Sequence, residues 1–251
     1  MRSTRIEPTA HGSTRVRFAR SVLADFERTR DKIATVASGA AGRVRVGAMV
    51  VALPVLLNRA IDLLKARSAQ TPVLVEEGDL TRLLPRLRLG ELDLLVGRLE
   101  PGDAAPDRET GGFDDGALCI VASPQHALVG QRTLGWADLA QHAWVMPPSW
   151  AWSRIKLNQM FCKHQINPPV DVIATASFLV TLSCICERGA LGFWACSVAR
   201  HDQRQGLVTV LPIKIPIDPP PVGLISLRGR LRAPAREQMI GCLRQAVSGA
   251  A

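Results

Sequence analysis

Three short groups of side chains have types and spacings that could carry chemistry. Ser153 and Lys156 fit the S-x-x-K spacing of a nucleophile found in penicillin-recognising enzymes, but the chain contains neither the S-D-N nor the K-T-G motif that completes it. Cys162 with His164, and the cysteines of the 184–186 segment, are metal-binding residue types, yet neither group has C-x₂₋₄-C spacing with a second pair. Packed thiols are the simpler interpretation of the apolar 184–186 segment. We therefore expect no catalytic residue, no metal site and no cofactor.

The composition is that of an ordinary globular protein. The chain has 251 residues, of which 47% are hydrophobic and 21% are charged, and this is long enough for one large or two small α/β domains. No apolar run reaches the length of a membrane span, and no apolar core follows the basic N-terminus as it would in a secretory signal. We therefore expect a cytoplasmic protein in which the six cysteines are reduced thiols.

The formal charge of +9 lies at the two ends of the chain. Residues 1–45 have ten Lys or Arg against four Asp or Glu, and residues 228–251 have five Arg against one Glu, whereas the body between them is almost neutral. A basic N-terminal arm is typical of a nucleic-acid contact. An Arg-rich helix that is simply solvated is the alternative.

Residues 9–37 have the pattern of one long helix that begins at a Thr9 cap. The apolar residues fall on the a and d positions of a seven-residue repeat, which is interrupted once by Arg30 and favours pairing with a second copy of the chain. A helix packed on its own domain is the alternative. The expected dimerisation residues are Val16, Ala19, Leu23, Phe26 and Ile33.

The rest of the chain is organised around the 80–99 segment, which predicts a helix followed by a buried strand. Asp79 can cap the helix, Gly90 can end it, and Pro85 should kink it. Strands at 44–51 and 72–75 and a helix after Pro54 precede this segment, so the order predicts a parallel sheet. Residues 100–116 are expected to be a surface loop. A second set of strands and helices follows from residue 117, with a closing helix from Pro234.

Four stretches in this order resemble the LysR-type transcriptional regulators over nearly the whole chain. They are EPTAHGSTRVRFARSVLADFERTRDKI, GRVRVGAMVVALPVLL, LTRLLPRLRLGELDLLVGRL and LCIVASPQHALVGQRTLGWADLAQHAWVMPP. The resemblance implies an α/β fold with a two-lobed, periplasmic-binding-protein-like (type 2) effector domain after a long linker helix. It also implies a homo-oligomer, a dimer or tetramer, that senses a small-molecule effector between the lobes and controls transcription. Contact with a membrane is not expected.

The resemblance also implies a division of the chain. Residues 1–42 correspond to the remnant of a winged helix-turn-helix and to the linker, residues 43–121 and 228–251 to lobe I, and residues 122–227 to lobe II. Family members begin with a DNA-binding domain of which only the last part, EPTAHG, is present in this sequence. We therefore expect a truncated regulator that binds DNA only if that domain is supplied.

The resemblance places effector contacts at turns and strand ends of both lobes. Many relatives have a small hydroxyl residue at the first turn and a Gly-Thr pair after the prolines. This chain has Met49 or Val50 and the 150–152 Trp-Ala-Trp segment there, which favours an aromatic or sugar-derived effector with an apolar or ring face and a carboxylate near Arg98. Burial in the core is the alternative for Trp150 and for Trp194. The expected contacts are Met49, Val50, Val51, Gly97, Arg98, Ser123, Pro148, Ser149, Trp150, Ser177, Phe178, Phe193 and Trp194.

Three other functions are compatible with the same features. A solute-binding protein of the same fold would need the secretory signal that we do not expect. A stand-alone protein could dimerise with a full-length regulator and modulate it. An enzyme on a two-lobed α/β scaffold, such as a porphobilinogen deaminase relative, lacks support from any catalytic constellation.

Overall fold

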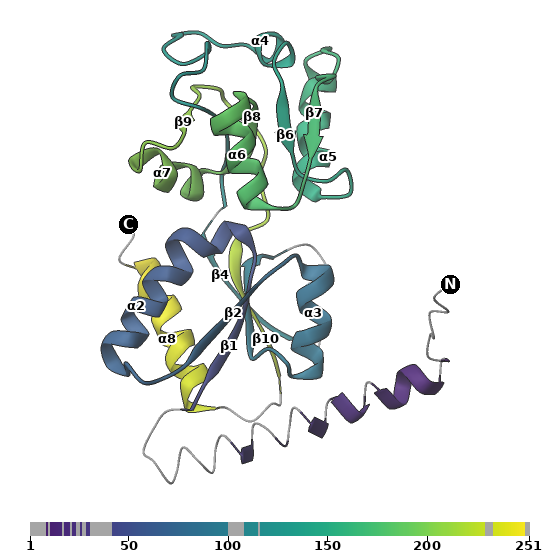
Figure 1. Cartoon of the computed structure of the whole chain (residues 1–251), viewed down its shortest axis with the longest axis vertical. Coiled ribbons are helices and arrows are strands. Elements are labelled where there is room, and N and C mark those ends of the chain that lie inside the picture. Colours follow the sequence, from purple (N-terminus) through teal and green to yellow (C-terminus); the bar gives the residue numbers. More distant parts are fainter. Residues whose placement is uncertain are drawn as a thin grey trace, which may run out of the picture. The chain divides into compact units, whose positions relative to one another are not determined.

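The computed structural model divides the chain into two compact units, which are Met1–Asp114 with Val222–Ala251, and Asp115–Pro221 (Figure 1). We call them unit 1 and unit 2. None of the described helices is both long and apolar enough to cross a membrane. The structure describes residues 9, 11–16, 18–20, 22–23, 26, 29–30, 42–99, 108–114, 116–228 and 233–248.

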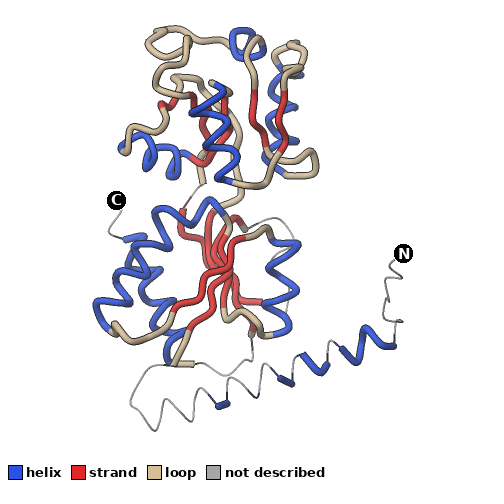
Figure 2. The backbone as a smooth tube through the Cα atoms, in the orientation of Figure 1, coloured by secondary structure: helices blue, strands red, loops and turns tan. Residues whose placement is uncertain are grey.

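Unit 1 contains a five-stranded sheet, sheet A, with the strand order β2-β1-β3-β10-β4. Strand β1 runs parallel to β2 and β3, whereas β10 runs antiparallel to β3 and β4. Figure 2 shows the strands of this unit with helices on both sides. All residues of β10 are buried, so the last strand of the chain lies inside the sheet formed by the first strands. The bounds are β1 Val44–Ala48, β2 Val73–Glu77, β3 Leu94–Arg98, β4 Arg108–Asp114 and β10 Val222–Leu227.

Helices cover both faces of sheet A (Figure 1). On one face, Leu64 of α2 and Leu243 of α8 pack in one core with alternate residues of the strands, such as Val46. On the other face, α3 buries Leu83 and Leu87 in a second core. The bounds are η1 Val50–Ala52, η2 Leu53–Leu57, α2 Asn58–Arg67, α3 Leu80–Leu89 and α8 Pro234–Ser248.

The predicted helix of the 80–99 segment is present with the expected ends. The Asp79 carboxylate accepts a hydrogen bond from the Arg82 backbone N–H at 3.0 Å, and Gly90 ends the helix in the left-handed conformation with φ 79°. Buried strand β3 follows, as predicted. Local signals were sufficient here because the cap, the apolar spacing and the terminal glycine all favour the same boundaries.

Unit 2 contains a second five-stranded sheet, sheet B, with the order β7-β6-β8-β5-β9. Strands β6, β7 and β8 are parallel, and β5 runs antiparallel to β8. The core includes Trp144, whose ring meets the edge of Phe161 with centroids 5.8 Å apart. The bounds are β5 Leu118–Ala122, α4 Trp136–Ala140, β6 Trp144–Met146, α5 Trp152–Lys163, β7 Val172–Ala174, α6 Phe178–Arg188, β8 Leu191–Ala195, α7 Cys196–Arg204 and β9 Thr209–Val210.

The structure changes two predicted boundaries. The division implied by the resemblance placed all of β5 but its last residue in lobe I, although the strand order had a second set begin at residue 117; β5 pairs with β8 and β9 in sheet B. Strand β10 was expected in the second lobe, but it pairs with β3 and β4 in sheet A. The chain therefore passes between the units at 114/115 and 221/222 rather than near 121–123 and 227.

The expected loop at 100–116 was wrong over its second half, where β4 forms. Its Gly-rich sequence was interpreted as a turn, but residues 108–114 pair with β10, and the close approach of the two backbones requires a glycine on the β10 side. A Cβ atom on Gly223 of β10 would overlap the carbonyl group of Gly111 in β4. Glycine inside a strand often marks such a contact.

Candidate functional site

The carboxyl ends of β1, β2 and β3 meet at one edge of sheet A, because these strands are parallel. The Met49 backbone N–H donates to the Val96 carbonyl at 2.9 Å, and the Gly78 N–H donates to the Ala48 carbonyl at 3.2 Å. The turn after β1 thus lies beside the end of β3. The structure therefore brings together Met49, Val50, Val51, Gly97 and Arg98 of the predicted contacts.

Side chains of unit 1 itself occupy much of this edge. A Cβ atom on Gly97 would overlap the Met49 side chain and would lie 2.8 Å from its Cβ, so Met49 rests directly on the glycine backbone. Arg98 is only 8% exposed and lies opposite Val222 in β10. Arg98 therefore has little surface to offer a ligand carboxylate, in contrast to the expectation for this residue.

The first turn after Met49 keeps one feature that suits a ligand. No side chain caps this turn, which continues from η1 through η2 into α2. Uncapped N–H groups at the start of a helix attract an anion or a carbonyl oxygen. Backbone groups at Val50 and Val51, rather than side chains, are thus what this turn can contribute.

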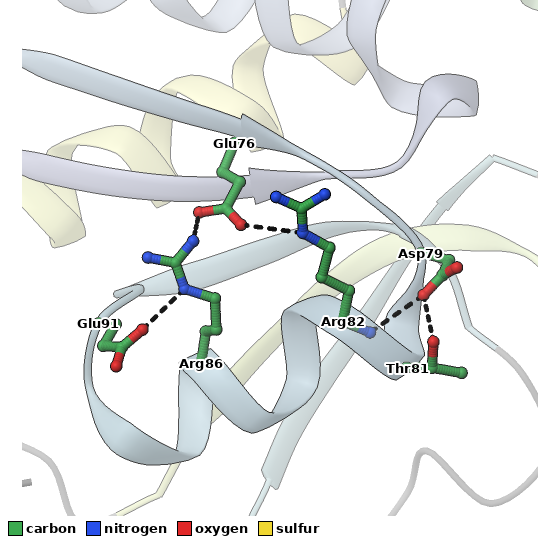
Figure 3. Close-up of polar contacts among 6 residues, drawn as sticks. All are labelled: Glu76, Asp79, Thr81, Arg82, Arg86 and Glu91. Atoms are coloured by element: carbon green, nitrogen blue, oxygen red, sulfur yellow. Dashed lines mark hydrogen bonds and ion pairs between the residues drawn. The ribbon is translucent and has the colours of Figure 1, made fainter. Parts of the chain in front are cut away.

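Two arginines of α3 form ion pairs with glutamates that lie beside the helix (Figure 3). Glu76 of β2 pairs with Arg82, at 3.5 Å, and with Arg86. The Arg86 Nε also donates to Glu91 at 2.7 Å. Asp79 is used as the helix cap. The network binds β2 to α3 and leaves these ionic groups with protein partners.

The second candidate edge is where β6, β7 and β8 end in sheet B. The Thr175 backbone N–H donates to the Met146 carbonyl at 3.0 Å, which places the turn after β7 beside the turn after β6. Ser177 caps α6 through a bond from the Val180 N–H. Phe178 packs on Trp194 with ring centroids 4.9 Å apart. This edge therefore brings together Pro148, Ser149, Trp150, Ser177, Phe178 and Trp194.

The two tryptophans at this edge differ in exposure. Trp194 is 6% exposed and lies beneath Phe178, as the core alternative predicted. Trp150 is 59% exposed, so the core alternative is wrong for this residue. Trp150 is the aromatic surface that a ligand could contact.

Two other predicted contacts do not join the edge. Phe193 faces the opposite side of sheet B from Trp194 and belongs to the core. Ser123 follows β5, and because β5 is antiparallel to β8, it lies at the amino edge of β8. There its hydroxyl donates to Gln125 at 2.6 Å and takes part in a turn. Ser123 thus lies apart from the other residues predicted in unit 2, because the direction of β5 was not evident from the sequence.

Arg154, in the first turn of α5, is a functional candidate that the sequence analysis missed. Its Nη1 donates to the Pro147 carbonyl at 3.3 Å, which holds the guanidinium group near the end of β6. Its Nε donates to the Asn158 side chain at 3.2 Å. Burial lowers the pKa of Arg154. The available signal was the absence of Asp and Glu from residues 147–163 and 175–186.

The metal-binding residue types do not gather into a set of three ligands within the described residues. Across the described residues, no group of three or more His, Cys, Asp or Glu side chains could hold a metal ion. Each of the six cysteines is a free thiol. The Cys162–His164 and Cys184–Cys186 groups thus have no third ligand within the described part of the chain.

The N-terminal segment is described only in part, and residues 11–16 and 18–20 are helical there. Four of the five expected dimerisation residues are described, and all are exposed. They are Val16, Ala19, Leu23 and Phe26. Ile33 lies outside the described residues.

Comparisons with known proteins agree with this architecture. The family model described as "LysR substrate binding domain" matches residues 37–248. The chain is 26% identical to the HTH-type transcriptional regulator GbpR of Azospirillum brasilense, over 96% of this chain and 71% of that protein. In fold it is similar to CbnR, a LysR family transcriptional regulator, with a TM-score of 0.71, 17% identity, and coverage of 97% of this chain and 83% of that one.

A third comparison is with an isolated domain, the BenM effector binding domain with its effector benzoate. The TM-score is 0.61 at 16% identity, over 83% of this chain and 93% of that chain. These likenesses confirm the two-lobed α/β fold expected from the sequence. The chain belongs to the LysR family of transcriptional regulators, and residues 37–248 are its effector-binding domain.

Proposed function

We propose that this chain is the sensing part of a transcriptional regulator, and that its effector is a small molecule with an apolar or ring face. The observation that carries the proposal is the match of the effector-binding family model to a chain whose unit 2 exposes Trp150 at the carboxyl edge of its parallel strands. Strand ends of this kind are the usual ligand sites of α/β sheets.

In unit 2 we propose Pro148, Ser149, Trp150, Ser177 and Phe178 as effector contacts. Serine hydroxyls beside two aromatic rings suit a ring that carries polar substituents. In unit 1 we propose the backbone of the turn at Met49, Val50 and Val51. BenM, a similar fold, has benzoate as its effector, which supports a ring-bearing ligand here.

We further propose a cytoplasmic, non-enzymatic homo-oligomer. The exposed apolar residues Val16, Leu23 and Phe26 support pairing through the N-terminal helical segment, because such a face is stable only when covered. Contact with specific DNA would be made by a winged helix-turn-helix domain, present in the same protein or supplied by a partner. The solute-binding alternative does not need this helical pairing.

Sedimentation analysis of the full chain tests the oligomer. Leu23→Glu with Phe26→Glu should convert a dimer or tetramer to smaller species, because two charges would enter the a/d seam. Phe18→Glu is the matched control, since Phe18 is equally exposed but lies off the seam. A wild-type chain that is monomeric at all concentrations would contradict this part of the proposal.

Ligand binding is tested by thermal unfolding of the full chain with ring carboxylates, ring amides and neutral sugars. An effector raises the unfolding temperature because it binds only the folded state. Intrinsic tryptophan fluorescence should change with the same ligands, because Trp150 lies at the proposed site. If no compound of any class changes either signal, the sensing proposal loses its support.

A further inference from the structure

The carboxyl edge of sheet B carries an unusual group of exposed apolar side chains. Trp150 precedes α5, Ile155 lies in its first turn, and Leu179 and Val180 lie in the first turn of α6. All four are exposed, and Leu179 is 75% exposed. Single exposed apolar residues are common on proteins, but several along one edge are typical of a binding surface.

The charge at this edge has one sign. The segments that leave the ends of β6, β7 and β8 contain no Asp or Glu over residues 147–163, 175–186 and 195–201. Arg154 and Lys156 lie in the first of these segments. The edge therefore combines an apolar surface with cations from α5.

The two arginines Arg154 and Arg188 show how this edge differs from the rest of unit 2. Arg188, at the far end of α6, donates to both carboxylate oxygens of Asp171, at 3.0 and 2.9 Å. Arg154 bonds only to neutral oxygens, of Pro147 and Asn158. Among the described residues, no carboxylate lies within ion-pair distance of Arg154.

An arginine in this state is suited to an anion. Burial lowers the pKa of Arg154, so the charged form has lost part of its hydration without gaining a counter-charge. Two of its donor atoms are fixed by the protein, which leaves N–H groups of a held guanidinium for a carboxylate. A hydrogen-bonded arginine also loses less side-chain entropy on binding a ligand.

We propose that Arg154 binds the anionic group of the effector, and that the apolar part of the effector lies against Trp150. The effector class is then an organic acid with a planar or apolar body, and the acid is held in unit 2 rather than at the buried Arg98. This inference rests on the proposed function, because it assumes that the edge binds an effector.

The test uses isothermal titration of the full chain with benzoate and cyclohexanecarboxylate, and with benzamide and cyclohexanecarboxamide as uncharged isosteres. The wild type should bind an acid more tightly than its amide. Arg154→Gln should raise the Kd of the acid by roughly tenfold or more, while leaving the amide unchanged. Arg154→Lys should restore part of the affinity, since lysine keeps the charge but not the planar fork.

Arg188→Gln is the matched control, because it removes an arginine of unit 2 that already has a carboxylate partner. Its affinity for the acids should equal that of the wild type. Far-UV circular dichroism and thermal unfolding without ligand show whether Arg154→Gln is folded. If that variant is unfolded, the comparison of wild type with Arg154→Lys for acid against amide decides the question.

Three results would overturn the inference. The first is an acid that binds Arg154→Gln and Arg154→Lys as tightly as the wild type. The second is binding of amides or neutral sugars with no binding of acids, which would leave the sensing function standing and remove only the anion. The third is no binding by any compound at millimolar concentration, which would count against the proposed function as well.

Discussion

The carboxyl edges of the two sheets are built from the same arrangement of parallel strands, but they differ in the side chains that they expose. In sheet A, Met49 covers Gly97 and Arg98 is buried. Two arginines of α3, Arg82 and Arg86, pair with Glu76. In sheet B, Trp150 is exposed and Arg154 has no carboxylate partner among the described residues. The difference supports our proposal that side chains of unit 2 contact the effector, whereas the turn after β1 in unit 1 offers mainly backbone groups.

The largest expected effect on stability tests whether Trp194 is buried and Trp150 exposed at the carboxyl edge of sheet B. Trp194→Ala should lower the free energy of unfolding by about 3–5 kcal/mol, since it removes a buried ring that packs on Phe178. Trp150→Ala should change it by less than about 0.5 kcal/mol, because Trp150 is exposed. Urea denaturation measures both. Similar losses of unfolding free energy for the two variants would show that Trp150 is packed against the protein as well.

The next largest effect tests whether Met49 is fixed over Gly97 at the carboxyl edge of sheet A. Gly97→Val should destabilise the protein by about 2–3 kcal/mol, because its side chain would overlap Met49. Adding Met49→Ala should recover part of the loss, since it removes the overlapping atoms. Gly241→Ala is the control, with open space around it in α8, and should be neutral or stabilising by about 0.5–1 kcal/mol. If Gly97→Val were neutral, Met49 would not be fixed over the glycine.

A smaller effect compares ion pairs in the two units. Arg86→Ala should cost about 1 kcal/mol, because Arg86 joins two half-buried carboxylates, Glu76 and Glu91. Arg188→Ala should cost less than about 0.5 kcal/mol, because its pair with Asp171 is exposed. Urea denaturation at low and high salt checks both, and the loss for Arg188 should disappear first. Equal losses of unfolding free energy would show that the half-buried pairs of Arg86 contribute no more than the exposed pair of Arg188.

The smallest expected effect is a pH dependence of stability that comes from His126 in unit 2. Burial and the neighbouring His142, whose ring centroid is 4.7 Å away, lower the pKa of His126. Its Nδ1 also accepts a hydrogen bond from the Leu128 N–H at 3.1 Å, which requires the neutral ring. The unfolded chain therefore binds more protons than the folded one just below about pH 6.5.

The unfolding free energy should thus fall as the pH decreases from about 6.5 through the lowered pKa of His126. His126→Gln should lose less stability than the wild type over this pH range, as measured by urea titration at each pH. Parallel pH profiles for the two proteins would show that His126 does not contribute.

The elements that could be predicted are those with complete local signals. The α3 helix has a capping aspartate, apolar residues at helical spacing and a glycine in the left-handed conformation, so its ends followed from the sequence. Strand β4 was missed because Gly111 and its neighbours are also typical of loops. Only the partner strand β10, more than a hundred residues away in the sequence, makes this segment a strand, and the glycine that their close approach requires is Gly223 of β10.

The candidate site could be predicted only in part, because strand directions decide which residues lie at the same edge of a sheet. Residues that follow parallel strands, such as Met49 and Ser177, lie at the expected edges, because the βα order implies the strand direction. Ser123 does not, because β5 runs the other way and no local pattern records this. Arg154 was overlooked because its significance depends on its partners in the fold, which among the described residues are the neutral oxygens of Pro147 and Asn158.

The position of β10 between β3 and β4 also affects the order in which the two units can fold during synthesis. Unit 2 is one continuous segment, Asp115–Pro221, and can complete its sheet before the last strand of unit 1 has been made. Until Val222–Leu227 arrives, β3 has an unpaired edge and β4 has no neighbour. Unit 1 is therefore begun before unit 2 and completed after it, and loss of β10 and α8 would remove an internal strand of sheet A rather than trim its surface.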